Sequence, residues 1–401
     1  MSTLADVIKL QIDFSSGPLA TPTYVDVTDD YTVGGSTSRG RDSIGPEDVF
    51  GTGSATIDRD NTFNSIPPTS WLRGKHVRIA SRVMDIPIFT GYVDQVSHDQ
   101  SAAPFRSAVS LSCVDNRFSR RRDTATNLLN DLIAEGVGVP VQPPDAAGII
   151  RAFSVPYHVD LDATFDLMGL SQALMANEIG FLAIQKDGSI AYNDRSWRLR
   201  QLANQYALPR AVFSDTPEAD SAYPLLAASA GGVLVVSEPE EAYRDRVEFT
   251  GLSGVTKIVA DVPADYDPTA FTQTTDCPND NWTAANASFV LKPALSTDLF
   301  WRKFTVRIWP TPDDTIIDAI CDIELGDIVE VLATPVGAGA RVESVLFVES
   351  ITHRFSASPQ VWDVTFGCSD ADAYFAAWGT NDDYLQYDDG QFYDTGLKFR
   401  P

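Results

Sequence analysis

The sequence is poor in the residues that most catalytic and metal sites use. Its 401 residues include only four cysteines and four histidines. The cysteines are far apart, with no Cys-x-x-Cys pair and no cysteine–histidine pair at the spacing of a zinc site. They are Cys113, Cys277, Cys321 and Cys368. We therefore expect buried free thiols, no metal site and no cofactor.

The motifs of the common enzyme classes are also missing. The chain has no glycine-rich dinucleotide or phosphate loop, no Gly-x-Ser-x-Gly and no His-Glu-x-x-His. Pairs of adjacent aspartates are so numerous that no two of them stand out as a glycosidase pair. The sequence predicts a protein that is not an enzyme.

Long apolar runs are absent as well. No window approaches the roughly 18 apolar residues that a membrane span requires. The first residues lack the basic and apolar blocks of a signal peptide. We expect a soluble chain without an export signal.

Basic residues are scarce relative to acidic ones. The chain has 30 Lys and Arg against 55 Asp and Glu, a formal net charge of −25. Residues 1–123 are nearly balanced, with 15 acidic and 13 basic residues, whereas residues 124–401 have 40 and 17. Simple solubility would explain such an acidic surface. The same negative charge opposes sequence-independent binding to DNA. The one basic cluster, residues 117–122, is better explained by ion pairs between subunits than by nucleic acid.

The sequence does contain an internal repeat. With His98 aligned to His353, an offset of 255, seven of 18 positions match without a gap, where chance gives about one. The run that begins at Gly74 also parallels the run at Gly326, at an offset of 252. The seven pairs are His98/His353, Ser101/Ser356, Ala102/Ala357, Pro104/Pro359, Val109/Val364, Cys113/Cys368 and Asp115/Asp370.

Each copy of the repeat predicts three short strands. In the last strand apolar and small polar residues alternate, so Val109 and Cys113, like Val364 and Cys368, should point into a core. Short strands with frequent turns indicate an antiparallel barrel or sandwich. The matched histidines are best explained as inherited structural positions, with a shared ligand or a pH-sensitive contact as the alternative.

The predicted fold class is β-rich α+β, with two related antiparallel β-barrel units flanking a smaller α/β region. The predicted regions are a first barrel (1–122), an α/β helix–hairpin module (123–210), a connecting β and loop region (211–300), a second barrel (301–370) and an acidic, aromatic C-terminal tail (371–401). Within the middle regions we expect helices over about 124–136 and 162–180, a hairpin that turns at Asp187-Gly188, a buried strand at 233–236, a charged strand at 243–249 and a loop at 261–283.

The C-terminal segment combines acidic and aromatic residues. Between Asp370 and Asp394 it has seven Asp and neither Lys nor Arg. Its charge favours a disordered tail, while its aromatic density favours a segment that docks on a partner. The candidate docking residues are Trp378, Tyr384, Tyr387, Phe392 and Tyr393.

Three runs follow one another along the chain in a distinctive order. The first contains GTGSATIDRDNTFNS, WLRGKHVRI and IFTGYVDQV, the second FLAIQKDGSIAYNDR, and the third IELGDIVEV, FVESITHRF and VWDVTFGCSDADAYFAAW. Together they resemble the minor tail proteins that form the tail-tip hub, or baseplate hub, of long non-contractile-tailed bacteriophages. One departure is the turn at Asp58–Asn61, where the family usually has an Asn-x-Asp-Gly type of turn.

The resemblance implies a structural role in the virion. Such hubs have two similar β-barrels per chain and form a homotrimer, so three chains present six barrels. That ring would adapt a sixfold tail tube to a threefold fibre or spike at the tail tip. The implied partners are the distal tail protein or tail tube, the tape measure protein, and a central fibre or other minor tail proteins. The host envelope would be reached only indirectly, and an acidic lumen would let DNA pass during genome ejection.

Other interpretations stay open at this point. A hexameric distal tail protein also begins with a β-barrel, but it would have one barrel in each of six chains. A wall-degrading hydrolase carried at the tip is a second alternative. A carbohydrate-binding module is a third, suggested by several tryptophans, although these are more often core or interface residues. The tryptophans concerned are Trp71, Trp282, Trp301 and Trp378.

Overall fold

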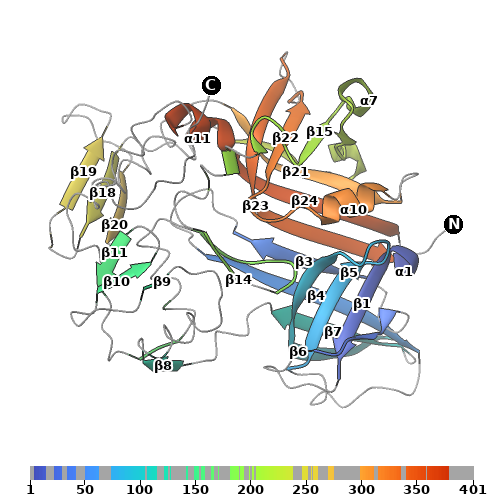
Figure 1. Ribbon diagram of the computed structural model, residues 1–401. Helices are drawn as coiled ribbons and strands as arrows, with labels where there is room; N and C mark the ends of the chain where they lie inside the picture. The colour runs from blue at the N-terminus through green and yellow to red at the C-terminus, as the bar shows by residue number, and fades with distance from the viewer. Residues whose placement is uncertain are drawn as a thin grey trace.

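The computed structural model is dominated by β-strands, and most of them belong to one sheet of 16 strands (Figure 1). No helix among the described residues has the length and apolar character needed to cross a membrane. The structure describes residues 4–14, 22–28, 34–41, 50–62, 74–103, 106–114, 122–124, 127, 141–142, 149–152, 155–158, 164–166, 170, 181–188, 190–193, 198, 201–202, 205–237, 246–251, 254, 256–260, 270–274, 299–310, 315–335, 340–357 and 359–378.

The N-terminal part of this sheet is called the first unit below. Its strands are β1 (Ile8–Asp13), β2 (Val25–Asp26), β3 (Gly34–Gly40), β4 (Phe50–Thr62), β5 (His76–Ser81), β6 (Pro87–Ala103) and β7 (Arg106–Val114). They lie in the order β3-β4-β7-β6-β5-β1-β2, and every neighbouring pair is antiparallel.

The C-terminal part of the sheet is the second unit. Its strands are β15 (Ala211–Ser214), β16 (Tyr223–Pro224), β17 (Leu234–Ser237), β21 (Phe300–Trp309), β22 (Ile328–Ala333), β23 (Val342–Ala357) and β24 (Gln360–Asp370). Successive neighbours are β17-β21-β24-β23-β22-β15-β16. The pairs that β15 forms with β22 and β16 are parallel, and the others are antiparallel.

The two units are joined edge to edge. Along one edge of β23, residues Val342–Phe347 pair with β22, and residues Ser350–Ser356 pair with β3. Figure 1 shows β3 lying along β23. One continuous sheet therefore links the N-terminal and C-terminal parts of the chain.

Alternation along the strands explains where the core lies. In β1, Ile8, Leu10 and Ile12 point inward and are almost completely buried, because side chains of a strand alternate between its two faces. In β21, Phe304 and Val306 do the same. These residues belong to one apolar core that spans both units. The centre of its C-terminal part is aromatic, with the Phe213 and Phe304 rings 4.8 Å apart.

Within the described residues, the helices whose two ends are defined are short. Besides the 3₁₀ turn η2 (Ala228–Ala230), the described ones with defined ends are α1 (Leu4–Val7), α7 (Pro217–Asp220), α10 (Thr315–Cys321) and α11 (Ala371–Trp378). Helix α10 packs Ile317, Ile320 and Cys321 into the core. The predicted class, a β-rich α+β fold of barrel-like units, is confirmed.

The remaining described strands lie off the main path, either attached to the large sheet or in three small sheets. Strands β13 (Phe181–Ile184) and β14 (Ile190–Asn193) form a hairpin, and β13 also pairs with β4. The predicted turn at Asp187-Gly188 is confirmed, since the Gly188 amide donates to the Gln185 carbonyl at 2.9 Å. The other strands are β8 (Arg122–Thr124), β9 (Val141–Gln142), β10 (Ile149–Ala152), β11 (Val155–His158), β12 (Thr164–Asp166), β18 (Arg246–Thr250), β19 (Thr256–Ala260) and β20 (Ala270–Thr274).

Three local expectations are wrong in part. Residues Thr164–Asp166, at the start of the helix expected over about 162–180, form β12 and pair with β8, so long-range pairing overrides the local helical pattern. Strand β20 lies inside the expected loop and pairs in parallel with β18. The strand expected to be buried at 233–236 is β17, in which Val235 is exposed, as is Val233 directly before it. Most of the helix expected over 124–136 lies outside the described residues.

The region boundaries stay predictions, although two features bear on how the regions are used. Strands β15, β16 and β17 come from the expected connecting region 211–300, yet they pair with strands of the second unit. Helix α11 occupies the first part of the expected tail and buries Ala371 and Ala373. Tyr206 stacks on its Phe375 with ring centroids 4.1 Å apart.

Candidate assembly site

The two aligned segments have the same strand register up to Asp99, where β6 has an irregularity that β23 lacks. His98 pairs with Val109 between β6 and β7, and His353 pairs with Val364 between β23 and β24. Each long strand also has a bulge at the same repeat position, beside Asp94 in β6 and beside Glu349 in β23. Bulges are specific local features, and here one lies at the same aligned position in both long strands.

A glycine turn precedes the first strand of each copy. Gly74 and Gly326 both have positive φ, 78° and 88°, a conformation that favours glycine. The Gly74 amide donates to the Val93 carbonyl, and the Gly326 amide donates to the Val348 carbonyl, each at 2.7 Å. The offset of 252 read from the sequence therefore places equivalent hydrogen bonds in both units.

The junction between the units contains a buried ionic cluster at the β23 bulge. Glu349 accepts hydrogen bonds from Arg41 Nε at 2.7 Å and Ser369 Oγ at 2.5 Å, and forms an ion pair with Arg198 at 2.6 Å. The Arg198 guanidinium also lies over the rings of Phe347 and Tyr374. A buried pair of this kind is costly to break, because the remaining charge has no solvent to compensate it.

The charge state of Glu349 follows from these contacts. Burial alone would raise the pKa of Glu349, but the charges of Arg198 and Arg41 outweigh burial and hold the pKa near 2. Arg41 directly follows β3, and its backbone amide donates to the Glu349 carbonyl at 3.0 Å. The cluster therefore fixes the end of β3 to the bulge of β23.

A second polar network lies nearby at the same junction. Arg39 of β3 donates to Glu324 at 2.6 Å. Glu324 also accepts the backbone amide of Lys186, at the turn of the β13–β14 hairpin. The Lys186 ammonium donates to the Cys321 and Asp322 carbonyls at the end of α10. Three chain segments far apart in sequence are held together here.

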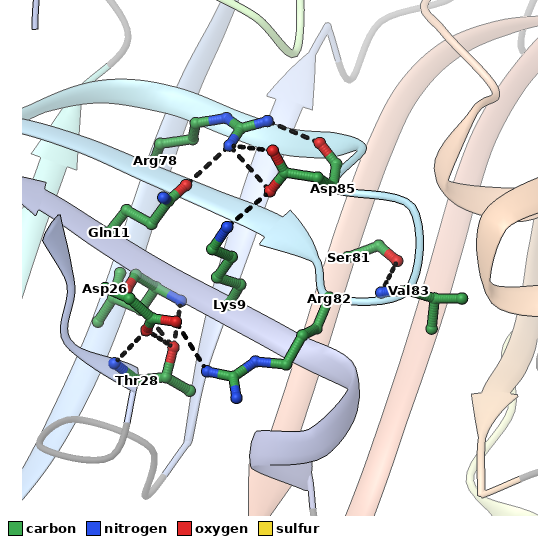
Figure 2. Close-up of polar contacts among 10 residues, drawn as sticks. Lys9, Gln11, Asp26, Thr28, Arg78, Ser81, Arg82, Val83 and Asp85 are labelled. Carbon is green, nitrogen blue, oxygen red and sulfur yellow. Dashed lines mark hydrogen bonds and ion pairs between the residues drawn. The ribbon is translucent and has the colours of Figure 1, made fainter. Parts of the chain in front are cut away.

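A different set of polar contacts lies in the first unit around β1, β2 and β5, as Figure 2 shows. Arg78 of β5 and Lys9 of β1 both contact Asp85, and Arg82 contacts Asp26 at 2.9 Å. Burial alone would raise the pKa of Asp85, but hydrogen bonds from Lys9 and Arg78 lower it. These groups are partly exposed, so water screens the ion pairs.

The second copy shows what the matched residues do. His353 is buried, and its Nδ1 accepts a hydrogen bond from Trp362 Nε1 at 3.2 Å. Val364 and Cys368 point into the core, and Pro359 lies in the exposed hairpin turn. Asp370 Oδ1 accepts the Ala373 amide at 3.2 Å in the first turn of α11. These are structural contacts of the fold.

The first copy is described less fully. His98, Val109 and Cys113 are placed by their backbone alone, and Pro104 and Asp115 lie outside the described residues. Trp378 is the last residue of α11, and the structure describes its backbone alone. Tyr384, Tyr387, Phe392 and Tyr393 also lie outside it. The proposed docking role of this segment stays a prediction.

The thiol expectation can be checked at two positions. Cys321 and Cys368 are free and buried, as predicted, and burial raises the pKa of both thiols. Within the described part of the chain, no three His, Cys, Asp or Glu side chains gather as a metal site requires.

Sequence reasoning missed the ionic cluster of Glu349, Arg41 and Arg198. One signal was available, because Glu349 interrupts the apolar alternation between Val348 and Ile351 and is aligned with Asp94 in the other copy. An acidic residue at both bulge positions indicates a special role for that position. The arginine partners come from distant segments, and no local pattern connects them to it.

No protein-family model matches the chain. No curated protein sequence matches it either. Solved structures do share its fold. A tail protein from Neisseria meningitidis MC58 is 12% identical with a TM-score of 0.55, over 92% of this chain and 99% of that one. The 43 kDa tail protein of prophage MuSo2 from Shewanella oneidensis is 10% identical with a TM-score of 0.53, over the same shares. At these identities the likeness concerns the fold.

Proposed function

We propose that this chain is a structural tail-tip hub protein of a bacteriophage virion. The observation that carries the proposal is the pair of units with one register, joined edge to edge in a single sheet. The fold shared with two tail proteins, one of them from a prophage, supports it, because the likeness extends over almost the whole of each chain. Its role would be assembly without catalysis.

Symmetry gives the duplication a purpose. Three copies of a chain with two equivalent units present six similar surfaces around one axis, while the complete chains retain threefold symmetry. One face of such a ring would fit the sixfold end of a tail tube or a hexameric distal tail protein. The opposite face would receive a trimeric fibre or spike, and the tape measure protein and other minor tail proteins would be further neighbours.

The charge of the chain suits a conduit. The net charge of −25 would repel DNA that passes through the ring, which limits retention of the genome during ejection. The host envelope would be contacted through the fibre, and the protein would have no specific site for nucleic acid.

A reconstruction of assembled tails that contain the chain tests this function. We expect density for three copies, with six units in a ring at the tip of the tail. Six copies with one unit each facing the axis would instead indicate a distal tail protein. Absence of the chain from purified tails would refute the proposal.

The C-terminal segment offers a separate test of partner docking. We propose that residues 379–401 bind a neighbouring tail protein. Because α11 packs against the second unit before this segment begins, a chain that ends at Trp378 should unfold at the same urea concentration as the full chain. It should recover fewer partner proteins in tail assemblies. Unchanged recovery, or loss of folding, would contradict this role.

A further inference from the structure

The junction between the two units is formed by one strand edge from each unit. Each of these two edges has a counterpart in the other unit. The junction pairs β3 of the first unit with residues Ser350–Ser356 of β23. The counterpart of that β23 segment is residues 95–101 of β6, by the offset of 255. One edge of β6 pairs with β7, and the other edge pairs with β5 only as far as Tyr92. In the described part of the chain, no strand pairs with residues 95–101 on that second edge.

The counterpart of β3 is β17. Strand β3 pairs with β4, and β17 pairs with β21. Strands β4 and β21 both pair with the last strand of their repeat, β7 and β24. The equivalent rows of paired residues are Ser112, Thr56 and Ser36 in the first unit and Gly367, Lys303 and Val235 in the second.

The rows fix the equivalence residue by residue. Ser112 and Gly367 differ by the repeat offset of 255, so Ser36 and Val235 occupy equivalent positions. The same reasoning makes Leu234 the counterpart of Gly35, because these residues pair with Phe304 and Ile57. Both matches lie before the irregularity that follows Val235 in β17.

Strand β17 is also chemically unusual for an edge. Leu234 and Val236 pack against the core, while Val233 and Val235 are 37% and 42% exposed. Within the described residues, its edge away from β21 has no strand partner. An open edge that carries exposed valines invites pairing with another chain.

We propose that β17 of one copy pairs antiparallel with β6 of the next copy, repeating between chains the junction that β3 and β23 form within a chain. Ser36 pairs with Arg354, and Gly35 pairs with Phe355. Transferred by the offset of 255, the first of these pairs places Val235 opposite Asp99, the last residue before the irregularity of β6 between Asp99 and Ala103. The occupant of each open edge is a second copy of this chain. The number of copies in the ring rests on the proposed function, whereas the pairing does not.

Disulfide trapping tests the register. Single variants Asp99→Cys and Val235→Cys are mixed, oxidised mildly and separated on a non-reducing gel, both as concentrated purified chains and within assembled tails. We expect a disulfide-linked pair that contains one chain of each variant, because directly opposed strand residues have Cβ atoms about 4.5–5.5 Å apart. A mixture of Asp99→Cys with Val233→Cys, displaced by two residues, is the matched control and should give at least fivefold less product.

A second measurement addresses the edge itself. Val235→Glu should weaken association at least tenfold in sedimentation, because it puts a charge into the junction, and should leave the urea midpoint of the monomer unchanged. Val25→Glu is the matched control, since Val25 is 50% exposed on β2, a strand outside the proposed junction. Equal weakening by both variants would overturn the proposed pairing.

The outcomes separate this inference from the proposed function. Absence of the mixed disulfide in both preparations refutes the pairing, and a ring in the tail reconstruction would then still support the hub. Conversely, the mixed disulfide supports the pairing even if no tail contains the chain. With the double variant Asp99→Cys/Val235→Cys, covalent products that end at three chains support a closed ring of three.

Discussion

The two units of this chain share a backbone plan and differ in what surrounds it. In both units a glycine turn leads into a strand, and a bulge interrupts the long strand at the same repeat position. In the second unit the bulge residue Glu349 is buried between Arg41 and Arg198, whereas Asp94 in the first unit is half-buried. The two units therefore have equivalent strand pairing at these positions, while the neighbours of each unit decide its polar contacts.

Surface charge shows the same divergence. Arg78 of β5 and Glu330 of β22 occupy equivalent positions at the offset of 252. Arg78 contacts Asp85, whereas burial and the nearby acids Glu343 and Asp372 raise the pKa of Glu330. A ring of such units would alternate a nearly neutral unit with an acidic one, so equivalent backbones would present two kinds of surface to a sixfold partner.

The largest effect should come from the bulge residues. Glu349→Ala leaves two buried arginines without their carboxylate, and we expect a loss of about 3–5 kcal/mol in the free energy of unfolding. Asp94→Ala, the matched change in the first unit, should cost less than about 1 kcal/mol. Urea unfolding monitored by circular dichroism measures both, and equal losses would show that the bulges are energetically alike.

The apolar positions should respond alike in both units. Val93 and Val348 are the same residue type at equivalent positions, and both are fully buried. Replacement by Ala removes two methyl groups and leaves a cavity, so each change should cost about 2 kcal/mol. If thermal unfolding shows one of the two losses to be below half of the other, the units are not packed equally well.

Part of the pH dependence of stability should come from His353. Burial lowers its pKa to about 3, and the positive charges of Arg39 and Lys186 act in the same direction. The unfolded chain binds a proton near pH 6.5 that the folded chain does not bind, so stability falls as the pH decreases below that value.

Between pH 7 and pH 5.5 this difference should lower the free energy of unfolding by about 1 kcal/mol. His353→Gln should remove that part of the decrease. Urea titrations of both proteins at the two pH values provide the check, and parallel decreases would exclude His353 as the source.

The smallest effects should come from the oppositely charged surfaces. Arg78→Ala breaks partly exposed contacts to Asp85 and Gln11 and should cost less than about 1 kcal/mol. Glu330→Gln should be neutral or slightly stabilising, because it removes repulsion from neighbouring acids. A marked loss of stability in the Glu330→Gln variant, measured by differential scanning calorimetry, would contradict this account of the second surface.

Local patterns predicted the parts of the fold that depend on neighbouring residues. The repeat offset, the strands at His98 and His353 and the hairpin at Asp187-Gly188 all follow from alternation and turn chemistry. The helix expected over about 162–180 is wrong at Thr164–Asp166, because pairing with the distant strand β8 decides that segment.

The candidate site was harder to anticipate. The sequence identified the matched histidines, and the structure describes the side chain of His353, which is buried and accepts a hydrogen bond from Trp362. The sequence did not identify β17 as the counterpart of β3, because these strands share no residue pattern and are related only through their pairing partners. Arg198 is likewise distant from Glu349 along the chain. Such contacts depend on three-dimensional proximity, which a single sequence does not contain.

The shared strand β23 also has a mechanical consequence. A single rigid strand pairs with its own unit through β22 and with the other unit through β3. The two units of one chain therefore cannot hinge apart without breaking the hydrogen bonds between β3 and β23 and the buried ionic cluster at Glu349. If an assembled channel widens, the movement should occur mainly at the boundaries between chains. The stiffness of one boundary can differ from that of the next.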